Sequence, residues 1–373
     1  MTKVSVILPI YNVSQYLREC LDSVARQTLK DIEIICVNDG STDCSLEIVE
    51  EYAENDSRFV ILDGPNGGYG KAMNRGLERA RGEYVGIVEP DDYVALTMFE
   101  DLYQIAVKQN LDWVKADFYR FVREKNRDMN LKYISLDSTH TQYNELLCPC
   151  REPNLIRFVM NTWSGIYKRE FLEEYQIRHN ETPGASFQDN GFFFQTMIYA
   201  KRAMILDQPY YRNRRDNPNS SVKSKEKVYC SNIEYDYIRD ILKRDPEVWE
   251  RFKAMYSWKK FHNYLFTIKR IDGQFREEYI ERAGAEFKRA FQQGDFSKEI
   301  FTVLEWEKLS LLMDRPGAFY EKYAKMEERN GVRSSKSSAQ CELEAIKSST
   351  TYKVGKLIMA LPCAAKRKIL ARK

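Results

Sequence analysis

Two apolar runs of the sequence end in acidic residues, one at Asp39 and the other at Asp91 and Asp92. An unpaired charge at the rim of a core is costly, so a buried strand ends on a carboxylate only where that group has a partner or a ligand. In an open parallel α/β sheet, ligands bind in the crevice outside the carboxyl ends of the strands. The two acidic strand ends therefore predict a site for a cation and for the phosphate-bearing ligand that it accompanies.

The elements expected to position these carboxylates alternate between strand and helix over the first hundred residues. Strands are predicted at 4–10, 32–39, 59–62 and 84–88, and helices from about 14, from 43 or 45, and at 71–80. This alternation is typical of right-handed βαβ crossovers and of a mostly parallel sheet. The predicted fold class is therefore α/β, with helices flanking the sheet.

The sequence excludes the common nucleotide motifs. A dinucleotide fold needs a Gly-x-Gly-x-x-Gly turn after the first strand, but residues 11–14 contain no glycine. The glycine-rich stretch 64–71 differs from a P-loop in its glycine spacing, and Ala72 stands where a Mg²⁺-binding hydroxyl is required. The Gly-rich, Arg-containing loop of a sugar-nucleotide pyrophosphorylase is also missing, which disfavours a nucleotidyltransferase.

Three stretches together resemble glycosyltransferase family 2: residues 4–12, 38–43 and 82–92. They occur in the order and spacing of that family, and the resemblance covers residues 3–215. It implies a GT-A fold, which is Rossmann-like. It also implies an inverting transfer from a nucleotide sugar, with Mn²⁺ or Mg²⁺ as the usual cofactor.

The first acidic strand end suits a nucleoside. Asp39 is followed by Gly40 and Ser41, a turn that lets a ligand approach the backbone closely. A carboxylate there can accept hydrogen bonds from a uracil imide or a ribose, and the resemblance gives Asp39 this role. The competing interpretation is that Asp39 only caps the turn.

The resemblance implies further nucleotide contacts on either side of Asp39. Pro9, Tyr11 and Asn12 would form the facing wall. Lys71 and Asn74, at the start of the helix after the glycine-rich turn, would contact the pyrophosphate or the base. A solvated Lys71 is the alternative.

The second acidic strand end corresponds to the metal-binding Asp-x-Asp of the family. Negative charge grows on a diphosphate as the glycosidic bond breaks, and a hard cation held by carboxylates neutralises it. Asp91 is expected to be the principal ligand, with Asp92 beside it as a supporting residue of the nucleotide site. Glu89 replaces the usual first Asp, and either reaches the metal through water or contacts the ribose. A plain acidic turn is the competing interpretation.

Inversion requires a general base opposite the leaving group. The family commonly carries an acidic pair about a hundred residues after the metal motif, and here that pair is Gln188 and Asp189. Asp189 takes the base position, with helix capping as the alternative role. Further candidates are Trp163 for the sugar or acceptor pocket and, for closing on the diphosphate, Arg212, Arg214 and Arg215.

The rest of the chain predicts a helical region and a division into domains. From about Lys225 apolar residues recur at helical spacing, which indicates a helical bundle that lines the acceptor site, mediates homo-oligomers, or both. The expected domains are 1–224 (catalytic, with a nucleotide half 1–100 and an acceptor half 101–224), 225–328 (helical) and 329–373 (linker and basic amphipathic tail).

Charge and cysteine content indicate the setting. The net charge of +3 divides into +8 for residues 333–373 and −5 for the remainder. A basic segment beside apolar residues is typical of a membrane-surface element, and a solvated tail is the alternative. Eight cysteines without regular spacing, and no signal peptide, predict a cytoplasmic protein. The basic segment would place it at the inner face of the plasma membrane. The sequence has no basic stripe outside the tail, so nucleic acid is not expected as a partner.

The sequence therefore predicts an inverting transferase that uses a nucleotide sugar, in particular a UDP-hexose. Its acceptor would be a glycan or a lipid-linked sugar in bacterial surface polysaccharide synthesis. The alternative is a catalytically inactive nucleotide-sugar-binding or assembly subunit, because Glu89 and Gln188 depart from the family pattern.

Overall fold

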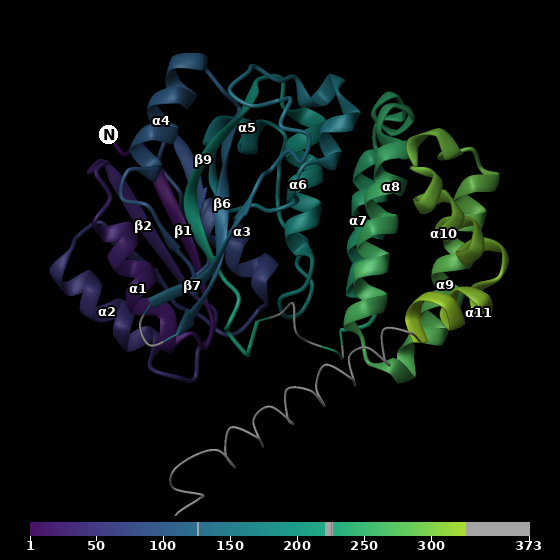
Figure 1. Ribbon diagram of the computed structural model, residues 1–373. Coiled ribbons are helices and arrows are strands. Elements are labelled where there is room, and N and C mark those ends of the chain that lie inside the picture. Colours follow the sequence, from purple (N-terminus) through teal and green to yellow (C-terminus); the bar gives the residue numbers. More distant parts are fainter. Residues whose placement is uncertain (125–126, 221–224, 226, 326–373) are drawn as a thin grey trace, which may run out of the picture.

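The computed structural model describes residues 1–124, 127–220, 225 and 227–325 (Figure 1). A nine-stranded sheet with flanking helices forms the N-terminal part, and a group of helices follows it. The linker and basic tail predicted for 329–373 lie outside the described residues, and the division at residue 224 stays a prediction. In the part of the chain that the structure describes, no helix is long and apolar enough to cross a membrane.

The first half of the sheet is parallel, as predicted. Its strands lie in the order β3-β2-β1-β4, and β1 pairs in parallel with both β2 and β4. Every residue of β1 and β2 is buried, which explains their continuous apolar runs. The elements are β1 (Val4–Ile10), α1 (Ser14–Ala25), β2 (Ile32–Asn38), α2 (Ser45–Asn55), β3 (Phe59–Leu62), α3 (Tyr69–Arg79) and β4 (Tyr84–Ile87).

The second half makes the sheet mixed. β8 runs antiparallel to both β4 and β6, β9 is parallel to β6, and β5 is antiparallel to β9. The sheet as a whole therefore has more antiparallel pairing than the sequence suggested, while the α/β class with flanking helices is confirmed. These elements are β5 (Tyr93–Val94), α4 (Met98–Gln109), β6 (Trp113–Glu124), β7 (Arg127–Ile134), β8 (Gly165–Lys168), α5 (Arg169–Glu174), α6 (Gln188–Tyr199) and β9 (Ala203–Arg214).

The predicted helical region follows β9. α7 packs between α6 and α8, so the helices are joined to the sheet through α6 (Figure 1). The side chain of Asp245 caps α8 by accepting from two backbone N–H groups, and Lys260 of α8 pairs with Glu286 of α9 at 3.0 Å. The elements are α7 (Cys230–Leu242), α8 (Pro246–Arg270), α9 (Gly273–Gln292), α10 (Val303–Asp314) and α11 (Pro316–Phe319).

The start of α3 is pressed against the loop before α6. Tyr69 N–H donates to the carbonyl oxygen of Gly184 at 3.0 Å. A Cβ on Gly70 would lie 2.0 Å from the carbonyl oxygen of Asn180, so only glycine allows this approach. The glycine-rich stretch thus joins the two halves of the sheet domain, which the sequence did not reveal.

We expect Gly70→Ala to lower the free energy of unfolding by about 1–3 kcal/mol, because the methyl group must push two backbone segments apart. Urea unfolding followed by circular dichroism measures this. Gly317→Ala is the matched control, since a Cβ there meets nothing within 4 Å. Equal stability of the two variants would contradict the close packing of α3 on the loop.

Candidate active site

A cleft of about 1290 Å³ lies outside the carboxyl ends of β1, β2 and β4 and extends to α8. It brings together eleven residues predicted from the sequence: Pro9, Tyr11, Asn12, Asp39, Glu89, Asp91, Asp92, Trp163, Asp189, Arg214 and Arg215. The other five predicted residues are not among the described residues that line it: Gly40, Ser41, Lys71, Asn74 and Arg212.

Asp39 organises the rim of the cleft. Its two carboxylate oxygens accept hydrogen bonds from the N–H groups of Gly67 and Gly68, at 2.8 and 2.9 Å. Gly40, at a φ of 70°, makes this contact possible, because a Cβ there would lie 2.6 Å from the backbone nitrogen of Asn66. Each carboxylate oxygen can accept a further hydrogen bond, so the nucleotide contact expected of Asp39 stays a prediction.

Two predicted residues outside the cleft support its walls. Ser41 accepts from the N–H of Asn12 at 3.1 Å, and so holds a residue that does line the cleft. Asn74 is buried, donates to the carbonyl of His179 and the carboxylate of Glu181, and accepts from the His179 N–H. Asn74 therefore fixes the loop after α5.

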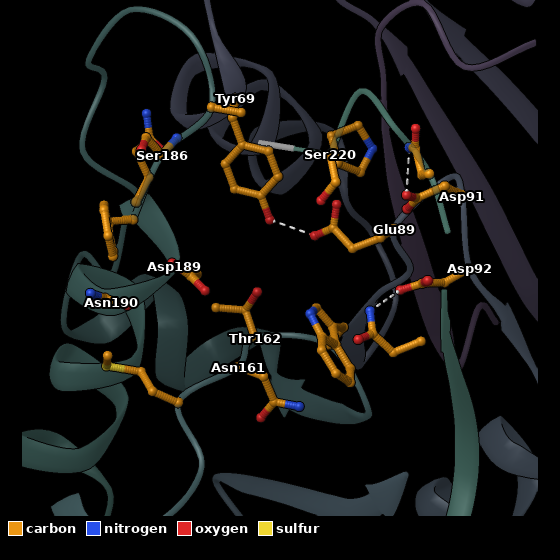
Figure 2. Close-up of a pocket in the computed structure, with 18 of the residues that line it drawn as sticks. Tyr69, Glu89, Asp91, Asp92, Asn161, Thr162, Ser186, Asp189, Asn190 and Ser220 are labelled. Carbon is orange, nitrogen blue, oxygen red and sulfur yellow. Dashed lines mark hydrogen bonds between the residues drawn. The ribbon is translucent and has the colours of Figure 1, made fainter. Parts of the chain in front are cut away.

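Asp92 anchors the acidic turn to β9. It is 1% exposed and accepts from the Arg214 N–H at 2.6 Å and the Asn213 amide at 3.0 Å (Figure 2). Burial, and then the charge of Asp91, raises the pKa of Asp92 well above its usual range. The Asp92 carboxylate is therefore already bonded to the protein. This fits a residue that supports Asp91, and a direct contact of Asp92 with the nucleotide stays a prediction.

Arg214 differs from the sequence-based expectation of a residue that closes on the diphosphate. Its side chain is 3% exposed and pairs with Glu19 at 2.6 Å and with Asp216 at 3.4 Å. It also donates to the backbone oxygen of Asp91 at 2.8 Å. Arg214 thus holds the acidic turn in place, whereas Arg215 is exposed and lines the cleft.

Asp91 offers the hard oxygen that Mn²⁺ or Mg²⁺ prefers. Only one of its carboxylate oxygens has a hydrogen-bond partner among the described residues, the Asn217 amide at 2.8 Å. Within the described ranges no three His, Cys, Asp or Glu side chains converge to hold an ion. A protein that binds such ions together with a substrate diphosphate needs only one or two carboxylates, so Asp91 with Glu89 fits that donor set.

Glu89 faces the same space and is held by Tyr69. The Tyr69 hydroxyl donates to its carboxylate at 2.8 Å, and the Glu89 N–H donates to the Tyr211 hydroxyl at 2.9 Å (Figure 2). Burial, and secondarily the charges of Asp91 and Asp189, raises the pKa of Glu89 to about 8, while the Tyr69 bond opposes this rise.

Asp189 stands in the first turn of α6 and enters the cleft from the side opposite Glu89 (Figure 2). Burial raises the pKa of Asp189 to about 6, and nearby backbone N–H groups and Lys115 act against it. Gln188 does not share this role. Its side-chain oxygen accepts from the Ser186 N–H at 2.5 Å and its amide donates to the Thr182 hydroxyl at 2.9 Å, so it shapes the preceding loop.

The helical region fixes the start of α6. Glu234 of α7 is buried and accepts from the Gly191 N–H at 2.9 Å and the Asn180 amide at 3.0 Å. A Cβ on Gly191 would lie 2.4 Å from this carboxylate. The position of Asp189 therefore depends on α7 as well as on the sheet.

Sequence reasoning missed three groups of the site. Tyr69 lies within the glycine-rich stretch, where an aromatic ring between glycines was a usable signal. Lys115 is buried and donates to the Asn161 side chain at 2.5 Å, and nothing in its strand distinguished it. The cleft-facing side of α8 was recognised only as one face of an amphipathic helix.

Comparison with known proteins identifies the family. The family model described as glycosyl transferase family 2 matches residues 5–176. The glycosyltransferase GlyG of Streptococcus pneumoniae is 43% identical over 228 residues, which cover 57% of this chain and 70% of GlyG. The chain belongs to glycosyl transferase family 2. This confirms the resemblance and shows that the chain carries a glycosyltransferase domain.

A relative and a solved structure add detail. EpsJ of Bacillus subtilis, an uncharacterized glycosyltransferase, is 37% identical over 217 residues, which cover 58% of this chain and 62% of EpsJ. The chain therefore matches less than two thirds of that relative. The structure of Staphylococcus aureus TarS 1–349 in complex with UDP-GlcNAc has a TM-score of 0.63 at 21% identity, covering 88% of this chain and 92% of that one, and confirms the fold.

We expect Tyr69→Phe to raise the pKa of Glu89 further above 8, because the hydroxyl stabilises the charged carboxylate. NMR titration of ¹³C-labelled glutamate in metal-free protein measures this pKa. Tyr103→Phe is the matched control, since its hydroxyl donates to Glu83 at 2.7 Å, away from the cleft. An unchanged Glu89 pKa in Tyr69→Phe would contradict the hydrogen bond.

Proposed function

We propose that this chain transfers a sugar from a nucleoside diphosphate sugar, a UDP-hexose in the first instance, to a hydroxyl of a glycan or lipid-linked acceptor in bacterial surface polysaccharide synthesis. The observation that carries the proposal is the location of Asp189 in the same cleft as Asp39 and Asp91. Family membership supports the donor class, and the UDP-GlcNAc complex of the similarly folded TarS makes uridine the first nucleotide to test.

In this proposal the cleft residues divide the work between binding and chemistry. The wall around Asp39 takes the nucleoside, and Asp91 with Glu89 would hold Mn²⁺ or Mg²⁺. A bound ion would neutralise the charge that grows on the leaving diphosphate. Asp189 takes the proton of the acceptor hydroxyl while the hydroxyl oxygen attacks the anomeric carbon from the face opposite the diphosphate. The nucleoside diphosphate leaves, and the configuration at that carbon is inverted.

The raised pKa of Asp189 suits a general base. A base works best when its pKa lies near the operating pH, and a value of about 6 leaves the carboxylate ionised yet basic at neutral pH. Asp189 ionises before Glu89, whose pKa is about 8. Glu89 would lose its proton on binding a cation, because a nearby positive charge favours the ionised form.

The departure at Gln188 does not support the alternative of an inactive binding subunit. Its amide holds the 182–186 loop through Thr182 and Ser186, and Asp189 remains as the ionisable group. Among the described residues nothing favours loss of chemistry. We further propose that the enzyme is cytoplasmic, with the basic segment 333–373 contacting the inner face of an anionic membrane, as its charge of +8 suggests.

Asp189→Asn should leave UDP binding intact and lower transfer by about 10²–10⁴-fold, since the amide cannot accept the proton. Calorimetric UDP titration and a transfer assay measure the two quantities. In the unchanged enzyme the rate should rise through about pH 6 as Asp189 ionises, and this rise should vanish in the variant. Asp314→Asn, exposed on α10, is the control. Full activity of Asp189→Asn would refute the assignment.

Asp91→Ala should abolish the Mn²⁺-dependent part of UDP binding while leaving the melting temperature nearly unchanged. Asp92→Asn should instead lower the melting temperature, because Asp92 holds two partners on β9. Titration of UDP with and without Mn²⁺, together with thermal unfolding, separates these effects. Metal dependence that survives in Asp91→Ala would remove Asp91 as a ligand.

A further inference from the structure

The far wall of the cleft is cationic. Four basic side chains line it, and we call them the cationic wall: Arg157, Lys227, Lys259 and Arg270. Lys259 and Arg270 lie eleven positions apart on α8, with Phe266 between them at helical spacing, so one face of the helix is turned to the cleft over about 16 Å. Arg157 comes from the short 3₁₀ helix Pro153–Arg157, which packs against α8.

These cations have neutral protein partners. Each donates to a backbone carbonyl: Arg157 to Ile300, Lys227 to Ala185, Lys259 to Phe158 and Arg270 to Lys227, at 2.5–2.8 Å. Among the described residues, none of the four has a carboxylate oxygen within 4.0 Å. The neighbouring Lys260, by contrast, pairs with Glu286 at 3.0 Å.

Two groups of the wall lack a compensating charge or a hydrogen-bond partner. Lys259 is 8% exposed, and burial, followed by the charge of Arg157, lowers its pKa to about 7. The Nε of Arg270 is buried without a hydrogen-bond partner. The carboxylate acting on Arg157 is that of Glu305, which is already bonded to His262 and the Thr302 N–H. Lys259 is the buried member of the wall, whereas Lys227 and Arg270 are half-buried and Arg157 is exposed. A buried ammonium group without an anion is unfavourable, so the wall is suited to an anion supplied by a ligand.

In the proposed function the donor diphosphate already has a place elsewhere in the cleft. The acidic turn that would hold it, together with a cation, lies at the strand ends, whereas the wall comes mainly from α8 and the short 3₁₀ helix before it. Asp189 lines the same cleft from the first turn of α6. The wall is therefore available to the acceptor, which must enter this cleft to reach Asp189.

We propose that the acceptor is anionic, a glycan chain bearing phosphate or carboxylate groups that lies along α8 between Arg157 and Arg270. This inference rests on the proposed transfer reaction, because it names the substrate that Asp189 deprotonates. Phe266, 43% exposed, and the adjoining Phe187 ring give the chain an apolar surface for its sugar faces. Arginine guanidinium groups suit bidentate recognition of either anion.

The test is calorimetric binding of three oligomers to the full chain: glycerol phosphate, galacturonate and neutral maltohexaose. The unchanged protein should bind at least one anionic oligomer roughly tenfold or more tightly than maltohexaose, and the anion that binds identifies the group. Arg157→Gln/Arg270→Gln, which keeps amide donors for the carbonyl partners, should lose roughly tenfold or more of this affinity. Arg289→Gln/Lys298→Gln, an equal charge change at exposed sites outside the cleft, should lose less than about twofold.

Equal binding of the neutral and anionic oligomers would overturn the inference, as would equal anion binding by the two double variants. UDP affinity, measured in the same proteins, should be unchanged, and competition between UDP and the anionic oligomer would reassign the wall to the diphosphate. Thermal unfolding shows whether the variants fold. The charge-preserving Arg157→Lys/Arg270→Lys should bind the anionic oligomer more tightly than the double Gln variant, because it keeps the positive charges. If the unchanged protein turned over no nucleotide sugar, the proposed function would be contradicted, whatever the binding of the oligomers shows.

Discussion

The hydrogen bonds that Asp92 accepts from β9 are the constraint on which the site depends. They join the turn after β4 to a strand more than a hundred residues later, and Arg214 completes the connection by reaching the backbone of Asp91 and the carboxylate of Glu19. Three acidic side chains within four positions repel one another. Their confinement is tolerable because neutral donors engage Asp92 and Glu89, while Asp91 is left to face the cleft.

The cleft is lined by groups of opposite charge that come from different parts of the fold. The strand ends supply carboxylates that need a cation, and α8 with the adjacent 3₁₀ helix supplies cations that need an anion. Glu234 holds the start of α6 through Gly191. The helical region thus both positions Asp189 and forms the wall that lines the same cleft, which explains why a site on the sheet requires helices from outside it.

The sequence predicted the parallel half of the sheet because its strands are continuous apolar runs. It singled out Asp39, Asp91 and Asp189 as site candidates because motifs mark them, and the structure places all three in one cleft. It could not predict that the four-residue β8 pairs antiparallel with two strands, since such a short strand is specified by its neighbours. Arg214 looked free because its partner Glu19 lies 195 residues away. Nothing in the sequence distinguishes Lys259 and Arg270 from the other cations of a helix, and only the structure places them against the cleft.

The central claim is a single displacement at the anomeric carbon, with Asp189 as the base. The most direct measurement is ¹H NMR of the anomeric configuration of the product formed from a panel of α-linked nucleotide sugars with Mn²⁺. The account predicts that one donor is consumed and that the new linkage is β. An α-linked product, or a panel in which no nucleotide sugar is consumed, would contradict it.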